Sequence, residues 1–457
     1  MSWQRSLGGF GIASALIVVA ACVAPAGGAR PSSPADQTSA SPDSSKTGDV
    51  VYLRNFQQDG AIVALDADTG QEVARFGAGI ATPDWKSLYG AELSGGATIV
   101  SATDVSRGTR TSKTIDGAGG YTFALPAVSF TGEPGGFSPN AKWLVLTTRG
   151  GVDYSSSGKP TKTPFVVLDA ALREPSKYIE LSGNYTFDAI SDSGRYLYLE
   201  EHLAADSYRV RVYDLQLGQL LPQIVVDKSA TGDRMAGTRV GSIASPDGQW
   251  QFTLYWRQGG NSFVHAIKLE EQWSVCLFLP VQTSGEEDFA WSFVASPDGR
   301  TAYAVNNLKG YVASIALTTA TVTRTATIDL QHASAPSLGD ELARFFFPVA
   351  EAKSEMFSVG VVSPDGRTLY ASGDFGRKIF AIDTATFAVR AKYAIETSTR
   401  VALQVMSIGV SADGARLYAI DSEGKSLVRL DAATGRLLQQ VRINGAYAGR
   451  ILRVVSH

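Results

Sequence analysis

A short turn repeats along the chain about every fifty residues, and this repeat constrains the fold more than any other feature of the sequence. Its clearest copies read Ser-Pro-Asp-Gly or Ser-Ala-Asp-Gly, and weaker copies occupy residues 82–85, 138–141 and 191–194. Proline presets the backbone of such a turn, aspartate bonds to neighbouring amides, and glycine adopts a positive φ. The spacing of the aspartates is 51 (247 to 298), 67 (298 to 365, with an insertion at 331–357) and 48 (365 to 413). Such a period is typical of the blades of a β-propeller.

Each repeat has the same order of expected strands. One apolar strand precedes the turn and a second follows it, and a third leads through an Asp-x-x-Thr-Gly turn into a fourth, as residues 406–441 show. Near-continuous apolar strands suit sheets that are buried on both faces, as in stacked blades. The second strands number eight, and they contain Tyr52, Tyr89, Trp143, Tyr198, Trp250, Tyr303, Tyr370 and Tyr418.

These strands predict an all-β fold, a β-propeller of about eight four-stranded blades. Seven blades are the alternative if residues 85–116, the weakest repeat, only decorate the ring. The first repeat lacks a strand before its second strand, and the last is followed by an additional strand at residues 450–455. We expect this C-terminal strand to pair into the first blade, because that closes the ring and removes an exposed sheet edge.

The Asp-x-x-Thr-Gly turn, which occurs at residues 66–70 and 431–435, invites comparison with a calcium loop. In residues 66–70, however, glycine comes one position too early for an EF-hand, and the distal glutamate is missing. We therefore expect Asp66 to cap its own turn. The four histidines occur singly, without the spacing of metal ligands. The sequence predicts no metal site and no cofactor.

The order Ser-Pro-Asp-Gly, strand, Asp-x-x-Thr-Gly resembles the YVTN-type β-propeller repeats of secreted bacterial and archaeal proteins, a WD-repeat-like class. It is also similar to the propellers of amine-dehydrogenase heavy chains and to the haem d1 domain of nitrite reductase. The resemblance covers roughly residues 50–456, although the tetrapeptide that names the repeat is not present. It implies the architecture and leaves the function open, because such propellers have many roles.

The first residues predict export from the cytoplasm. Arg5 precedes an apolar stretch that is too short for a good bilayer span, and residues 19–22 read Val-Ala-Ala-Cys, which resembles the lipobox of bacterial lipoproteins. The resemblance implies a signal peptide at 1–21, a lipidated Cys22, a Ser/Pro-rich disordered tether to residue 48 and a single propeller domain at 49–457. We expect an extracytoplasmic, membrane-anchored lipoprotein. A signal cleaved after Ala26, giving a secreted or periplasmic protein, is the alternative.

Charge and cysteine content limit the partners. The formal net charge is −3 and no basic block occurs, so we expect no nucleic-acid binding. If Cys22 is lipidated, the one other cysteine, Cys276, has no intramolecular disulfide partner, and its apolar surroundings predict a buried, unreactive side chain. We expect a monomer that binds an envelope protein or a small ligand.

The connections of each blade divide between the two faces of the ring. Because strands alternate in direction, both short turns share one face, the short-turn face. Connections between second and third strands and between blades share the opposite face, the long-loop face, and they are longer and irregular. Binding sites often lie on variable loops that a rigid scaffold holds. The candidate binding residues end the second strands on that face: Arg149, Glu201, His202, Trp256, Arg257, Asn306, Asn307, Asp374 and Arg377.

Motifs of the common propeller-associated enzymes do not occur in the sequence. It contains neither a Gly-x-Ser-x-Gly elbow nor a Cys-x-x-Cys-His haem motif, and we assign no catalytic residue. We therefore expect a binding or scaffolding lipoprotein that acts through its long-loop face. A lactonase-like or other hydrolase propeller is one alternative, which a His–Glu–Arg cluster at the channel mouth would favour. A quinoprotein or haem-type redox propeller is the other.

Overall fold

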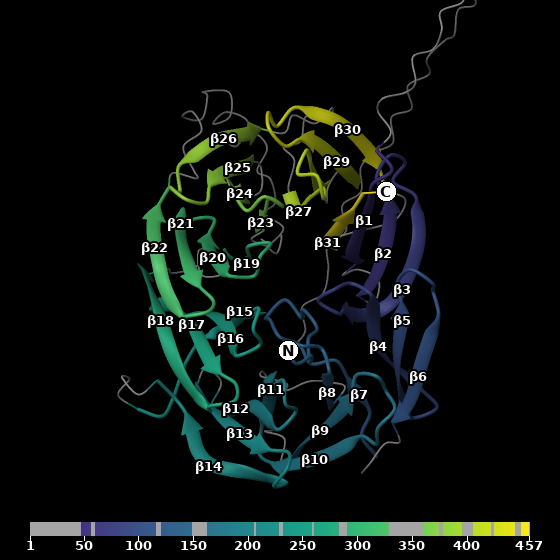
Figure 1. Cartoon of the computed structure of the whole chain (residues 1–457), viewed down its shortest axis with the longest axis vertical. Helices are drawn as coiled ribbons and strands as arrows, with labels where there is room; N and C mark the ends of the chain where they lie inside the picture. Colours follow the sequence, from purple (N-terminus) through teal and green to yellow (C-terminus); the bar gives the residue numbers. More distant parts are fainter. Residues whose placement is uncertain are drawn as a thin grey trace, which may run out of the picture. The chain divides into compact units, whose positions relative to one another are not determined.

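The structure is a computed structural model, and nearly all of the backbone that it describes is strand and turn. The described residues belong to one compact unit, Ser45–His457, whose sheets follow one another around a ring (Figure 1). In this part of the chain, no helix is long and apolar enough to cross a membrane. The described residues are 47–55, 60–115, 120–148, 162–204, 207–227, 232–257, 260–282, 290–328, 360–373, 378–394, 405–421, 425–443 and 449–456.

The described strands form eight antiparallel blades, each counted outward from the centre of the ring. Blade 1 contains β31 (Gly449–Val455), β1 (Val50–Asn55), β2 (Ala61–Asp66) and most of β3 (Glu72–Ala81). Blade 2 contains the end of β3, β4 (Ser87–Ser94), β5 (Ala97–Asp104) and β6 (Arg110–Ile115). Blade 3 contains β7 (Phe123–Ala124), β8 (Trp143–Thr148), β9 (Lys162–Asp169) and β10 (Lys177–Ser182). Blade 4 contains β11 (Tyr185–Ile190), β12 (Tyr196–Ala204), β13 (Ser207–Asp214) and β14 (Gln219–Val225).

The second half of the ring repeats this arrangement with little variation. Blade 5 contains β15 (Thr238–Ala244), β16 (Trp250–Trp256), β17 (Asn261–Lys268) and β18 (Trp273–Gln282). Blade 6 contains β19 (Trp291–Ala295), β20 (Thr301–Asn306), β21 (Tyr311–Ala316) and β22 (Thr321–Thr327). Blade 7 contains β23 (Gly360–Val362), β24 (Thr368–Gly373), β25 (Lys378–Asp383) and β26 (Val389–Ala394). Blade 8 contains β27 (Val405–Val410), β28 (Arg416–Asp421), β29 (Ser426–Asp431) and β30 (Leu437–Arg442).

The C-terminal strand closes the ring, as the sequence predicts. β31 pairs antiparallel with β1, with Val50 opposite Val455 and Asn55 opposite Gly449. The weakest repeat, residues 85–116, forms a blade of its own, so the count of eight is confirmed. Blades 1 and 2 differ from the others because they share β3 and thereby form one seven-stranded sheet.

The repeated turns are closed by their own side chains. In one copy, the Ser245 hydroxyl donates to Asp247 Oδ1 (2.6 Å) and accepts from the amide of Trp250 (2.9 Å), while Gly248 has a φ of 68°. Asp66 caps its turn in the same manner, because its Oδ1 accepts from the Thr69 amide and hydroxyl, each at 2.8 Å. The polar groups of the short-turn face are therefore largely engaged within the turns.

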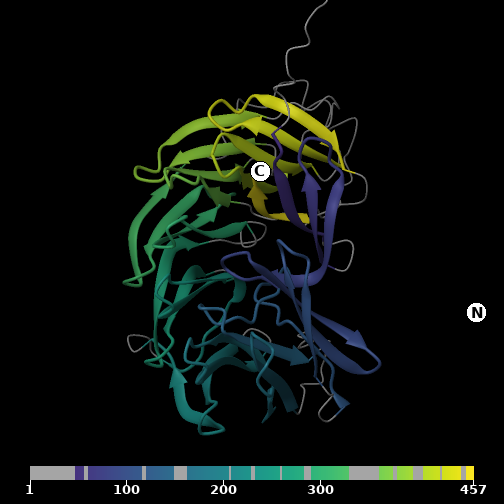
Figure 2. The ribbon, with the colours of Figure 1, turned by 45° about the vertical axis from the view of Figure 1, so that its right-hand side comes forward.

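Apolar clusters hold neighbouring blades together. Seven such clusters lie in the described part of the ring, one for each pair of neighbours except blades 1 and 2. Between blades 8 and 1, for example, Leu53 and Val63 pack against Tyr418 and Ile420, all fully buried. Burying one such side chain stabilises the fold by about 1.5–3 kcal/mol. Figure 2 shows the blades stacked in this way.

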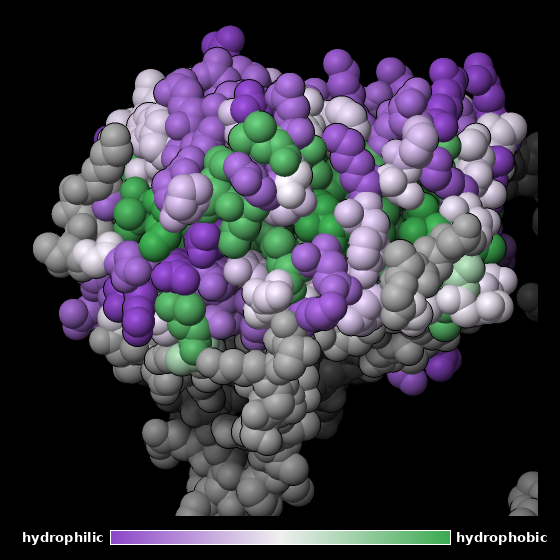
Figure 3. Space-filling view, turned by 90° about the horizontal axis from the view of Figure 1, so that it is seen from below, coloured by the Kyte–Doolittle hydropathy of each residue, from purple (hydrophilic) through white to green (hydrophobic). Residues whose placement is uncertain are grey.

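The outer edge of the ring carries apolar side chains, some of them adjoining, between polar ones. Figure 3 shows this mixture on the edge that lies lowest in Figure 1. The exposed large apolar residues of blades 3, 4 and 5 include Tyr178, Leu217 and Phe278. Proline interrupts two of the outermost strands, Pro222 in β14 and Pro280 in β18. Because proline cannot donate to a neighbouring strand, it limits pairing of these edges with other sheets.

Candidate functional site at the central channel

A hairpin in blade 3 projects into the middle of the ring. The innermost strand of this blade starts as β7, which pairs with the end of β8, and it resumes at Phe137, which bridges to Leu144. Between these points, residues 125–136 leave the sheet and fold back through a bridge between Ala127 and Pro134. We call residues 125–136 the channel hairpin. Figure 1 shows it among the blue loops inside the ring.

The channel hairpin is fastened to blades far from its own. The amide of Phe130 donates to the carbonyl of Arg239 in blade 5, with an N···O distance of 2.9 Å. Glu133 forms ion pairs with two residues of blade 1, Arg54 (3.4 Å) and Arg450 (3.2 Å). Burial lowers the pKa of Arg54, although the nearby Glu133 carboxylate acts to raise it. The hairpin therefore connects blades 3, 5 and 1 across the middle of the ring.

Buried charged side chains lie between blades 4 and 5, next to the strand that the hairpin contacts. Arg239 Nη2 is 2.8 Å from Glu200 Oε1 and 3.6 Å from Asp188 Oδ1. The hydroxyl of Tyr255 donates to Glu200 Oε1 (2.5 Å) and that of Thr186 donates to Oε2 (3.0 Å). We call Asp188, Glu200 and Arg239 the buried triad, because each is at most 8% exposed.

A β-bulge explains how Asp188 comes to lie there. The register of β11 against β12 shifts between Phe187 and Ala189, so Asp188 is an extra residue in its strand. Phe187 packs into the cluster between blades 3 and 4, whereas Ala189 packs into the cluster between blades 4 and 5. In a regular strand these two side chains would share one face. The bulge redirects the strand and turns the Asp188 carboxylate toward Arg239.

The pKa values of the two triad carboxylates are shifted in opposite directions. Burial raises the pKa of Asp188 to about 7, which the nearby Arg239 opposes and Glu200 reinforces. No described residue donates a hydrogen bond to either Asp188 oxygen. Burial also acts to raise the pKa of Glu200, but Arg239, His202 and Tyr255 outweigh it, and the net pKa is lowered. One guanidinium thus serves two carboxylates, and the better bonded one keeps the negative charge.

Two histidines lie near the buried triad. His202 Nε2 is 2.8 Å from the Thr186 hydroxyl and 3.8 Å from Glu200 Oε2. Burial lowers the pKa of His202, although the nearby Glu200 carboxylate acts to raise it. His265, in β17, is fully buried, and neither ring nitrogen contacts a hydrogen-bonding group of the described chain. Burial lowers the pKa of His265 to about 4, so the His265 ring is neutral at pH 7.

The predicted residues of blade 4 lie beside this cluster. His202 belongs to it directly, through Thr186 and Glu200. Glu201 lies on the opposite side of the strand, where its Oε2 accepts from Arg209 (2.6 Å) and Arg211 (2.8 Å). Sequence reasoning therefore identified two neighbours of Glu200, whereas Glu200 itself contacts the arginine of the triad.

The candidate binding residues of blades 5 and 6 lie away from the buried triad's contacts described above. Trp256 is half-buried and packs against the apolar cluster between these blades, and the half-buried Arg257 follows it toward the long-loop face. Asn306 caps the turn after β20, because its Oδ1 accepts from the Lys309 amide (2.8 Å). Asn307 joins blades 6 and 7 by donating to the Ser372 hydroxyl (2.9 Å).

The remaining predicted residues lie outside the described part of the chain. They are Arg149, Asp374, Arg377 and the expected lipidation site, Cys22. The described cysteine, Cys276, is free and half-buried, and burial raises its thiol pKa to about 12. In the described residues, no group of three or more histidine, cysteine or acidic side chains has the geometry of a metal site.

Sequence reasoning missed the channel hairpin, Asp188 and Arg239. The hairpin has a recognisable signal, because residues 125–136 contain two prolines and three glycines within an expected apolar strand. A β-bulge leaves no comparable signal in the residues around Asp188. The three members of the buried triad come from three strands of two blades, so their proximity follows from tertiary packing.

Comparisons with known proteins agree on the fold. No protein-family model and no curated protein matches the chain. Among solved structures, apo AztD from Citrobacter koseri matches with a TM-score of 0.52 and 12% identity, over 90% of this chain and 98% of that one. The dihydro-haem d1 dehydrogenase NirN in complex with DHE matches with a TM-score of 0.51 and 14% identity, over 90% and 75%. At these identities the likeness shows the fold alone, and the chain is thus a β-propeller.

The charged groups beside the channel hairpin are largely buried. His202, Glu200 and Arg239 do converge, which is the arrangement that would favour a hydrolase. However, Glu200 is 5% and Arg239 is 8% exposed, and Glu200 is engaged by three neighbouring groups. Buried charges that pair with each other, as Glu200 and Arg239 do (2.8 Å), help to fix the shape of the inner strands.

Proposed function

We propose that this chain is an extracytoplasmic binding module whose long-loop face, around the end of the central channel, binds an envelope protein or a small ligand. The observation that carries the proposal is the asymmetry of the ring. Arg239 and His202 lie toward the long-loop ends of their strands, and Glu200 and Asp188 lie near the middle of theirs. The channel hairpin braces the adjoining strand β15. The short-turn face consists of turns whose polar groups bond to one another. Variable loops that a rigid set of inner strands holds in place are suited to binding a ligand or a partner protein.

Two side chains offer the most direct contacts on that face. Trp256 ends β16 and Arg257 follows it, and a tryptophan beside an arginine is a frequent composition of binding hot spots. The cluster under Trp256 holds the strand end in place. Truncating both side chains therefore removes contact area while the blade beneath stays packed.

The proposal is tested by affinity capture with the full-length chain in its own cell envelope. The bait is compared with the double variant Trp256→Ala/Arg257→Ala and with Arg257→Glu, which leaves the half-buried tryptophan in place. A matched control, Arg300→Ala/Arg436→Ala, truncates two exposed side chains of the short-turn face. The backbone amides of Arg300 and Arg436 keep their turn hydrogen bonds in this control.

We expect partners or ligands, identified by mass spectrometry, to disappear from both long-loop variants and to persist with the control. Thermal unfolding of each purified variant verifies the fold. Identical captured species for all baits would refute the proposed face, as would a loss that occurs only with the control.

The lipid anchor is the second part of this proposal. The lipobox-like residues 19–22 support acylation of Cys22, and two or more acyl chains give stable membrane attachment. The described chain begins at Thr47, where the Asp68 carboxylate of the short-turn face accepts from the Thr47 amide (2.8 Å). The tether would therefore join the ring at the face opposite the proposed binding surface. Globomycin treatment and a Cys22→Ala variant should each release the protein from membranes.

A further inference from the structure

The junction between blades 1 and 2 is built differently from the other junctions of the ring. An apolar cluster fills each of the seven other junctions, but none occurs between the described residues of these two blades. β3 instead passes from one blade to the other, pairing with β2 up to Ala78 and with β4 from Gly79 onward. The residues that line this junction are a mixture of glycines, polar residues and a few apolar ones such as Phe76 and Leu88. The junction therefore contains a pocket of about 220 Å³.

Glycines keep this pocket open. A Cβ atom on Gly79 would lie 2.2 Å from the carbonyl oxygen of Tyr89, and one on Gly90 would lie 3.0 Å from that of Ala78. Neither position accepts a side chain without moving the backbone. Backbone of β3 and β4 therefore forms one wall, and Phe76 adds a half-buried ring to the lining.

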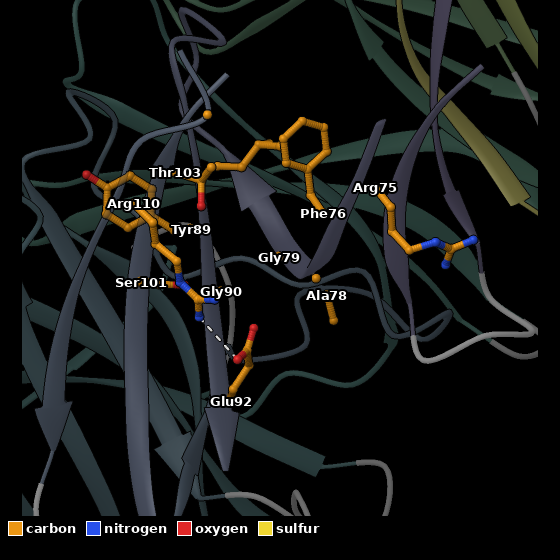
Figure 4. Close-up of a pocket in the computed structure, with 13 residues that line it drawn as sticks. Arg75, Phe76, Ala78, Gly79, Tyr89, Gly90, Glu92, Ser101, Thr103 and Arg110 are labelled. Atoms are coloured by element: carbon orange, nitrogen blue, oxygen red, sulfur yellow. Dashed lines mark hydrogen bonds and ion pairs between the residues drawn. The ribbon is translucent and has the colours of Figure 1, made fainter. Parts of the chain in front are cut away.

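The other wall is polar and carries no net charge. Arg110 Nη2 is 3.1 Å from Glu92 Oε2, and the hydroxyls of Ser101 and Thr103 line the space beside them. Figure 4 shows Arg110 and Glu92 joined across the pocket, whereas the guanidinium of Arg75 points away from them. One positive and one negative group facing a ligand favour a neutral molecule over an anion.

We propose that this pocket binds a neutral, hydroxyl-rich molecule of about the size of one sugar ring, either free or at the end of a glycan. Its volume is below the roughly 300–1,000 Å³ of sites for drug-sized ligands. The guanidinium supplies donors, the carboxylate supplies acceptors, and the two hydroxyls supply both. The side chains of Arg110 and Glu92 are 46% and 52% exposed, so their mutual attraction is weak and sugar hydroxyls replace it at little cost.

Titration calorimetry of the full-length chain with glucose, N-acetylglucosamine and maltotetraose tests the proposal. We expect millimolar binding of at least one probe, and maltotetraose shows whether a chain end is accepted. Glu92→Gln and Ser101→Ala should each weaken binding about tenfold, equivalent to about 1.4 kcal/mol. Glu271→Gln is the matched control, because Glu271 is also exposed and forms an ion pair, with Lys268 (3.1 Å), and neither residue lines the pocket.

Three results would overturn the proposal. The first is no heat of binding with any probe at roughly 10 mM, ten times a Kd of about 1 mM. The second is an equal loss of affinity in Glu92→Gln and Glu271→Gln, and the third is tighter binding of glucuronate than of glucose. The site is independent of the proposed long-loop face. Trp256→Ala/Arg257→Ala should therefore bind the sugar normally, so failure of one proposal is distinguishable from failure of the other.

Discussion

At the scale of single residues, the channel is shaped by charges that the fold buries. Asp188 and Glu200 share Arg239, and only Glu200 receives further hydrogen bonds. Glu133 similarly joins two arginines, of which Arg54 has a side chain only 6% exposed. Buried ionic groups need every partner they have, since an unpaired buried charge is strongly destabilising. The effect on the free energy of unfolding can therefore be predicted for Asp188 as a function of pH and for Glu133 when its charge is removed.

Asp188→Asn should make the protein more stable at pH 8 than the wild type. The unfolded carboxyl releases its proton near its ordinary pKa of 3.8, whereas burial holds the folded pKa at about 7. Between these values the folded state binds more protons, so the free energy of unfolding contributed by Asp188 falls as pH rises. The fall amounts to at most about 1.4 kcal/mol per pH unit and ends above pH 7.

Urea unfolding of wild type and Asp188→Asn from pH 4 to pH 8 measures this difference. The two proteins should have similar stability at pH 4 and diverge with rising pH, while the exposed Asp233→Asn follows the wild type throughout. A variant that is less stable than the wild type at pH 8 would show that Asp188 is ionised and favourably paired.

Glu133→Gln should loosen the channel hairpin. The change keeps the shape of the side chain but leaves the buried Arg54 without its carboxylate. We expect the free energy of unfolding to drop by about 1–3 kcal/mol, the cost of a poorly satisfied buried group. Hydrogen exchange of the Phe130 amide should also become faster. Glu174→Gln, at an exposed position, is the control, and an equal effect there would contradict the bracing role of the hairpin.

At the scale of elements, the C-terminal strand closes the ring. β31 pairs with β1, and its Ile451 and Val454 pack into the cluster between blades 8 and 1. A second connection reinforces this junction, because the buried Asp49 accepts from Arg416 (2.8 Å) and Tyr418 (2.5 Å) of blade 8. The ring is therefore closed by residues from both ends of the domain.

Deleting residues 449–457 should open the ring. The deletion exposes the inner edge of β1 and removes the apolar side chains that β31 contributes, so we expect a lower melting temperature and concentration-dependent association. Deleting only residues 456–457 should change neither. Sedimentation and calorimetry distinguish the two truncations. A monomeric, fully stable 449–457 deletion would mean that closure does not depend on β31.

At the scale of the whole molecule, the repeat predicts far more of the fold than of the site. Turn chemistry and strand order recur in each blade, so eight blades and their closure follow from local sequence. The site depends on differences between blades, such as the bulge at Asp188 and the hairpin at residues 125–136. Glu200, Arg239 and Asp188 come together only through packing, and no spacing in the sequence indicates it.

The central proposal is that the ring has one recognition face, opposite the face where the described chain begins. Photo-crosslinking in intact cells tests it most directly, with p-benzoylphenylalanine placed at position 257 on the long-loop face or at position 300 on the short-turn face. Mass spectrometry of the adducts should find a specific partner or ligand attached at 257 and none at 300. A specific adduct at 300, with none at 257, would contradict the account.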